Sequence, residues 1–130
     1  MTILVAYVPR PEGRAAISKG IEMAKLMNER LLVINASAGT PVDDEAIATS
    51  NEVTAIEKEL AASGIEAEFK QLIRGKTPVE ELETLAESQQ VSMLVIGLRK
   101  RTPIGKMFLG SVAQEILLSV SCPVLAVKAR

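Results

Sequence analysis

One stretch, from Gly97 to Val112, places residues that bind anions between a buried strand and a helix. The apolar run from Met93 to Ile96 before it predicts a fully buried strand. Gly110 and Ser111 precede an apolar segment that predicts a helix over roughly 112–120, and we expect Ser111 to cap it. Free N–H groups at a helix start and the helix dipole favour a bound phosphate. Four cations lie in the predicted loop of the same stretch: Arg99, Lys100, Arg101 and Lys106.

Two common phosphate motifs do not fit this chain. A P-loop requires a glycine where Lys100 stands and a Ser or Thr where Met107 stands. The glycine spacing of the dinucleotide fingerprint is absent after the first apolar run. Purely structural roles stay open for the residues that remain: Gly97 could serve only to permit a positive φ, and Ser111 only to cap its helix.

Composition narrows the classes of function. The formal net charge of −1 gives no electrostatic support for a nucleic-acid partner, and the apolar runs are too short to span a membrane. We interpret the apolar N-terminal segment as a first strand rather than a signal peptide. The single cysteine, Cys122, excludes an internal disulfide framework and agrees with a cytoplasmic protein; we expect a small buried residue there rather than a reactive thiol.

Histidine is absent from the sequence. The chain therefore lacks the commonest general base and the commonest transition-metal ligand, so we expect no transition metal. The carboxylates nearest in sequence to the predicted site, Glu12 and Glu115, have no spacing that fixes a geometry for catalysis. An enzyme is thus the third choice among the functions considered, with slow turnover at most.

Strands and helices alternate along the whole chain. The apolar runs and the period-two pattern predict strands over 2–8, 31–35, 65–73, 92–97 and 124–127. Helical periodicity, with Asp43 or Asp44 as one cap and Thr77-Pro78 as another start, predicts helices over 14–30, 44–62, from 77 onward and over 112–120.

This order predicts an α/β fold: a doubly wound, five-stranded parallel sheet of strand order 3-2-1-4-5 with helices on both faces. We expect residues 1–130 to form a single domain, because no linker or repeat interrupts the pattern. In such sheets ligands bind at the carboxyl ends of the strands, where the strand order reverses. Val8 and Gly97 should therefore flank the same crevice.

The same residues resemble a known family. Gly97 is followed after twelve residues by Gly110-Ser111, a helix, and the terminal segment Ser121-Cys122-Pro123-Val124-Leu125-Ala126-Val127. This pattern resembles the Gly-x2-Gly-x9-Gly-Ser/Thr signature and the final strand of the universal stress protein family. The resemblance implies an adenine-nucleotide-binding α/β fold, usually a homodimer, that acts in stress or starvation responses rather than as a fast catalyst.

Two positions depart from the family pattern. Lys100 stands where the signature has its second glycine, and Val8 stands where nucleotide-binding members carry an aspartate at the end of the first strand. The resemblance implies that backbone amides and Ser111 Oγ hold the phosphates and that the end of the first strand borders the base. The implied site residues are Ala6, Tyr7, Val8, Ala36, Gly97, Leu98, Arg99, Lys100, Gly110, Ser111 and Val112.

Two functions remain in view. The first is a regulator that binds ATP or a related adenine nucleotide, with Mg²⁺ left open. The second is a dimeric interaction module of the same fold that no longer binds a nucleotide, which the changes at Lys100 and Val8 favour. In either case the resemblance implies a homodimer formed through the strand from Val124 to Val127. Neither function involves nucleic acid or a membrane.

Overall fold

Parallel strands form the centre of the fold, and their order confirms the predicted one. The computed structural model describes residues 1–39, 46–100, 107–108 and 110–129. Within them, five parallel strands are arranged β3-β2-β1-β4-β6. Their bounds are β1 Thr2–Ala6, β2 Arg30–Ser37, β3 Ala67–Ile73, β4 Val91–Lys100 and β6 Val124–Lys128.

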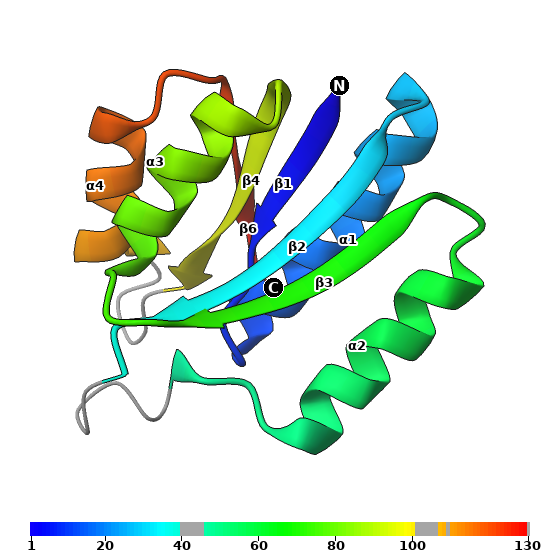
Figure 1. The fold of residues 1–130 in the computed structure, drawn as a ribbon, viewed down its shortest axis with the longest axis horizontal. Coiled ribbons are helices and arrows are strands. Elements are labelled where there is room, and N and C mark those ends of the chain that lie inside the picture. The colour runs from blue at the N-terminus through cyan, green and yellow to red at the C-terminus, as the bar shows by residue number, and fades with distance from the viewer. Residues whose placement is uncertain (40–45, 101–106, 109, 130) are drawn as a thin grey trace.

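Helices cover both faces of this sheet, as predicted (Figure 1). The helices α1 (Pro11–Met27) and α2 (Ser50–Ala62) lie on one face, while α3 (Pro78–Ser88) and α4 (Ser111–Ser119) lie on the other. Strand residues alternate between two buried clusters, so Ile3 and Val5 pack with α1 and α2, whereas Leu4 packs with α3 and α4. Because β1 is buried on both faces, its sequence is a continuous apolar run rather than an alternating pattern.

Two helices start at other residues than the sequence predicts. Helix α1 begins at Pro11 rather than at residue 14, because proline suits the first turn of a helix, where no N–H partner is required. Helix α2 begins at Ser50 rather than at residue 44. Its cap is a capping box between Thr49 and Glu52, in which each side chain accepts from the other's backbone N–H. The proposed caps Asp43 and Asp44 lie outside the described residues.

The segment between β4 and α4 also differs from the prediction. Strand β4 continues to Lys100 instead of ending at Gly97, and residues 99 and 100 pair with a short antiparallel strand, β5 (Met107–Phe108). Part of the expected cationic loop is therefore a strand. Ser111 is not the cap of α4: Gly110 occupies that position in an extended conformation, and Ser111 is the first helical residue.

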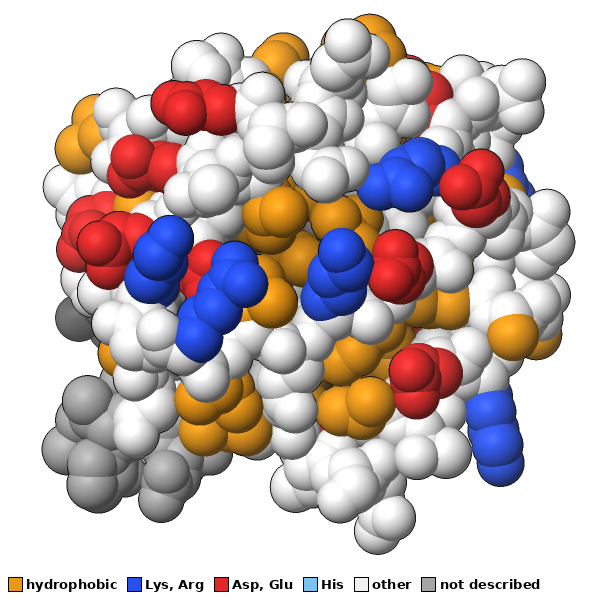
Figure 2. Space-filling model, viewed as in Figure 1, with side chains coloured by type: hydrophobic (Ala, Val, Ile, Leu, Met, Phe, Trp, Pro, Cys, Tyr) orange, Lys and Arg blue, Asp and Glu red, His pale blue; other side chains and the backbone are white. Residues whose placement is uncertain are grey.

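The other predicted elements are present with shifted ends: strand 2–8 is β1 Thr2–Ala6, strand 65–73 is β3 Ala67–Ile73, and helix 112–120 is α4 Ser111–Ser119. Thr77 caps α3, with Pro78 at the first helical position. Strand β3 lies at one edge of the sheet and alternates between half-buried and exposed residues, as an edge strand should. In the view of Figure 2, hydrophobic side chains are visible near the centre of the surface, with Lys, Arg, Asp and Glu side chains around them. In the part of the chain that the structure describes, no helix is long and apolar enough to cross a membrane.

Candidate functional site

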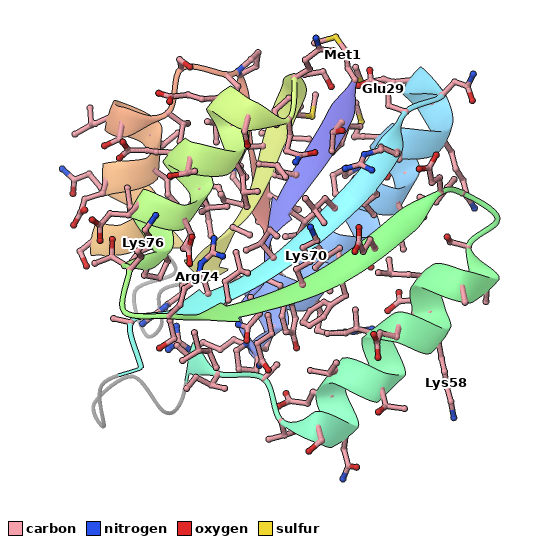
Figure 3. All side chains as sticks on the ribbon, viewed as in Figure 1. Met1, Glu29, Lys58, Lys70, Arg74 and Lys76 are labelled. Carbon is pink, nitrogen blue, oxygen red and sulfur yellow. The ribbon has the colours of Figure 1, made fainter. Side chains whose placement is uncertain are left out.

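A cavity of about 300 Å³ opens at the carboxyl ends of β1, β2 and β4. Val8 and Gly97 both line it, which confirms that they flank one crevice between β1 and β4. Figure 3 places Arg74 and Lys76 at this end of the molecule, and Met1 and Glu29 at the opposite end. The cavity thus lies where the strand order reverses, the place where open α/β sheets bind ligands.

Most of the predicted site residues meet in this cavity. Leu98 does not line it, and the side chain of Lys100 lies outside the described part of the structure. The binding role of the others stays a prediction, but their placement together is a finding: Ala6, Tyr7, Val8, Ala36, Gly97, Arg99, Gly110, Ser111 and Val112 all line the cavity.

One side of the cavity is the start of α4. Gln114 N–H donates to Gly110 O at 2.9 Å, which is the first hydrogen bond of the helix. By helix geometry, the N–H groups of the preceding turn have no partner inside the helix. That turn lines the cavity with Gly110, Ser111, Val112 and Ala113. Free N–H groups at the positive end of a helix dipole form a site for an anion.

Gly97 serves a different purpose from the positive φ considered in the sequence analysis. The glycines with positive φ in the described residues are Gly39, Gly64 and Gly75. At Gly97, an added Cβ would lie 2.0 Å from the carbonyl oxygen of Glu12 and 2.8 Å from its Cβ. The missing side chain therefore lets the first turn of α1 pack directly on β4.

This packing brings two charged residues into the cavity: Arg10, which sequence reasoning missed, and Glu12, which it named as a nearby carboxylate without a fixed geometry. Glu12 Oε2 lies 3.3 Å from Arg99 Nε and 3.9 Å from Arg10 Nη1. The Glu12 side chain is 9 % exposed, whereas those of Arg10 and Arg99 are 35 % and 49 % exposed. The sequence offered one signal for this helix start: Pro11 is followed by a glutamate, and that pair is typical of a first helical turn.

The rest of the wall is apolar and is held in place by a buried amide. Asn35 Nδ2 donates to Tyr7 O at 3.1 Å and to Ala46 O at 2.8 Å, while Asn35 Oδ1 accepts from Ala48 N–H and Gln71 Nε2. These bonds join the end of β1, the segment before α2 and β3. Apolar residues that line the cavity include Ala6, Ile34, Ala36, Leu82, Ile96 and Ile116, which belong to the cluster packed with α3 and α4.

Tyr7 belongs both to the core and to the cavity wall. It is 3 % exposed, and its ring meets that of Phe69 edge-on, with the centroids 6.4 Å apart. Burial raises the pKa of the Tyr7 phenol, and the nearby charge of Glu52 raises it further. The phenol therefore stays neutral near neutral pH and behaves as a fixed part of the wall.

Neither a metal centre nor a reactive thiol emerges from the described residues. Among them, no group of three or more His, Cys, Asp or Glu is placed to hold a metal ion. Cys122 is half-buried, and burial raises the pKa of its thiol, which disfavours the nucleophilic thiolate.

Comparison with known proteins agrees with this architecture. The model of the universal stress protein family matches residues 1–128. A universal stress protein of Mycolicibacterium smegmatis is 48 % identical over 126 residues, which are 97 % of this chain and 96 % of that protein.

Solved structures show the same fold. A universal stress protein from Archaeoglobus fulgidus superimposes with a TM-score of 0.78 at 29 % identity, covering 98 % of both chains. The structure of the universal stress protein from Archaeoglobus fulgidus in complex with dAMP has a TM-score of 0.72 at 25 % identity, again over 98 % of both chains.

Proposed function

Because the chain belongs to the universal stress protein family, we propose that it binds an adenine nucleotide in the cavity between β1 and β4. Binding there serves regulation of a stress response rather than fast catalysis. Among the described lining residues, Glu12 is the carboxylate, and its pairing with Arg99 leaves it poorly suited to activate water. Hydrolysis is accordingly slow or absent.

The observation that carries this proposal is that the cavity is lined by two chemically different sets of residues. The start of α4 and the Arg99 side chain provide N–H donors and positive charge. Much of the remaining lining is aliphatic, with Ile34, Leu82 and Ile96 among its residues. A nucleotide has the matching division, since its phosphates are anionic acceptors and its base is flat and largely apolar on its faces.

The residues at the end of β1 suggest how the nucleoside is held. Val8 offers no carboxylate to the ribose, so the contacts there come from backbone groups and from apolar surface around Ala6 and Ala36. On the phosphate side, the Ser111 hydroxyl makes no capping bond and is left to donate to a phosphate oxygen. The dAMP complex of the Archaeoglobus fulgidus protein supports an adenine nucleotide as the ligand class.

A direct test is the nucleotide content of the natively purified protein, followed by calorimetric titration of ATP and AMP into the stripped protein. The informative variant is Ser111→Asp, because aspartate suits the first turn of a helix but repels a phosphate there. Gln114→Asp is the matched control: it adds the same charge to the same helix at an exposed residue that does not line the cavity.

We expect Ser111→Asp to abolish binding and Gln114→Asp to retain it. Equal binding by both variants, or no binding of either nucleotide to the wild-type chain, would contradict the proposal.

A second candidate function is a dimeric module in which the cavity takes no nucleotide. Strand β6 supports the dimer part of both candidates, because it pairs with β4 and is the last parallel strand of the described sheet. An edge strand of this kind can pair with a second copy. Exposed hydrophobic side chains of α4, Leu117 and Leu118, lie on the helix that leads into β6.

Sedimentation tests the dimer. Ala126 is exposed on β6, so Ala126→Lys places like charges near the two-fold axis without disturbing the core. Ala61→Lys makes the same change at an exposed residue of α2 and serves as the control. We expect only Ala126→Lys to sediment as a monomer. A wild-type chain that already sediments as a monomer would contradict both dimer proposals.

The proposal also covers the counterion of the nucleotide and the location of the protein in the cell. Mg²⁺ would accompany a di- or triphosphate as its counterion, held by the phosphates rather than by a protein cluster. A cytoplasmic location agrees with a chain whose single cysteine, Cys122, is a free thiol.

A further inference from the structure

We infer that Glu12 makes the cavity select adenine nucleotides of low phosphate charge, so that a monophosphate or cyclic monophosphate binds at least as well as ATP. This inference rests on the proposed function and names the class of nucleotide that the same site takes.

The backbone and Cβ of Glu12 are fixed at the edge of the cavity. Its carbonyl and Cβ pack against Gly97 so closely that a Cβ on that glycine would clash with both. Gly13 follows in the same turn, where an added Cβ would lie 1.8 Å from Val8 O. The first turn of α1 is thus clamped between the ends of β1 and β4. The carboxylate itself is held at the cavity by its ion pairs with Arg99 and Arg10.

The carboxylate faces the groups that a phosphate would use. Its Oε2 atom lies 3.3 Å from Arg99 Nε and 3.9 Å from Arg10 Nη1. Among the described lining residues, Arg10 and Arg99 are the cations and Glu12 is the anion. One negative charge is therefore already placed between two guanidinium groups before any ligand binds.

A phosphate at the start of α4 would share Arg99 with this carboxylate, because Ser111 and Arg99 line the same cavity. Glu12 is largely excluded from water, so its repulsion of a ligand is weakly screened. The repulsion grows with each further charge on the phosphate chain. A single phosphate can lie on the N–H groups of α4 while leaving the Glu12 pair intact, whereas a longer chain that also uses Arg99 competes with Glu12 for its guanidinium group.

Two other roles would use the same carboxylate in the opposite sense. Glu12 could accept hydrogen bonds from ribose hydroxyl groups, or it could hold a Mg²⁺ ion beside the phosphates. In both roles the carboxylate strengthens binding, so its neutralisation would weaken it. If Glu12 repels the ligand, its neutralisation strengthens nucleotide binding instead. The direction of the change in affinity therefore separates the interpretations.

The test titrates AMP, cyclic AMP, ADP and ATP into three proteins at one ionic strength, with and without Mg²⁺. These are the wild-type chain, Glu12→Gln, and the control Glu22→Gln, which removes a carboxylate from the exposed side of the same helix. We expect Glu12→Gln to tighten ATP binding about tenfold and AMP binding by no more than about threefold. Glu22→Gln should leave all affinities unchanged.

The outcomes distinguish this inference from the function it rests on. Weaker binding of any nucleotide by Glu12→Gln, or the same change for AMP and ATP, overturns the selectivity role while nucleotide binding stands. A wild-type chain that binds ATP more than tenfold tighter than AMP overturns it as well, and this measurement requires no variant to fold. No binding of any nucleotide to any of the three proteins overturns the proposed function and this inference together.

Discussion

Arg74 holds the carboxylate of Glu81 through two parallel hydrogen bonds. Arg74 Nε donates to Oε2 at 2.7 Å, and Nη2 donates to Oε1 at 2.8 Å. The Glu81 side chain is fully buried, whereas that of Arg74 is 56 % exposed. Because Arg74 follows β3 and Glu81 lies in the first turn of α3, this pair fixes the connection beside the cavity wall formed by Pro78 and Leu82.

Removing Arg74 should destabilise the chain. In Arg74→Ala the buried Glu81 carboxylate loses the two hydrogen bonds that it accepts from Arg74, and we expect the free energy of unfolding to fall by about 1–2 kcal/mol. Arg14→Ala is a suitable control, because it breaks an ion pair with Glu59 in which both side chains are substantially exposed. Chemical denaturation of both variants measures the difference. An equal, small loss in the two variants would mean that the Arg74 pair adds nothing beyond a surface contact.

The same pair predicts a dependence of stability on pH. The hydrogen bonds from Arg74 hold the pKa of Glu81 below its ordinary value of 4.5. A carboxyl group whose pKa is lower in the folded than in the unfolded chain stabilises the fold above the unfolded value, and that contribution is lost as the pH falls through the folded value. We therefore expect the wild-type chain to lose stability below about pH 4.5.

In Arg74→Ala the buried carboxylate has lost the charge that lowers its pKa, so the variant should lose less stability over the same range. Melting temperatures of the two proteins, measured from neutral pH downward, should converge in acid. Parallel curves would contradict the assignment to this pair.

Much of this architecture could be predicted from the sequence, because apolar runs on β1, β2 and β4 and helical periodicity between them permit few alternatives. The crevice between Val8 and Gly97 follows from that topology. The start of α2 could also have been predicted, since Thr49 and Glu52 have capping-box spacing. The acidic residues at 43 and 44 were the alternative caps, and the prediction used them instead.

What could not be predicted depends on contacts between distant segments. Pro11 and Glu12 mark a helix start locally, but Glu12 enters the cavity because Gly97, on another element, allows α1 to approach β4 closely, and that contact has no local signal. Asn35 lies inside a strand that is buried on both faces, so the pattern of polar and apolar residues does not indicate what its side chain contacts. Its partners come from three other segments, so only the folded chain shows them.

The approach of α1 to β4 predicts the effect of Gly97→Ala. The new methyl group would lie 2.0 Å from a backbone oxygen of Glu12, so a helix turn must shift, at a cost of about 1–3 kcal/mol. Gly64→Ala makes the same chemical change with nothing within 4 Å, and its positive φ of 80° should cost about 1 kcal/mol.

Nucleotide titration separates the two glycine variants further. Gly97→Ala should also change nucleotide affinity, because Glu12 moves with the turn, while Gly64→Ala should not. Unaltered affinity in a destabilised Gly97→Ala would show that the first turn of α1 is independent of the site.

The buried amide of Asn35 predicts a strong effect of a nearly isosteric change. In Asn35→Asp the two donors to Tyr7 O and Ala46 O are lost, and carboxylate oxygens face those carbonyl oxygens. We expect a loss of about 2–3 kcal/mol at neutral pH, partly recovered in acid, where a protonated carboxyl group can donate one hydrogen bond again.

Gln71→Ala removes a neighbour that donates to Asn35 Oδ1 and Ala48 O but is itself exposed, so it should cost less. Because Asn35 ties Tyr7 at the end of β1 to Ala46 before α2, and both line the cavity, Asn35→Asp should weaken nucleotide binding more than its loss of global stability explains. Binding measured well below the melting temperature separates the two effects. Full affinity in folded Asn35→Asp would show that this end of the cavity is shaped by the strands alone.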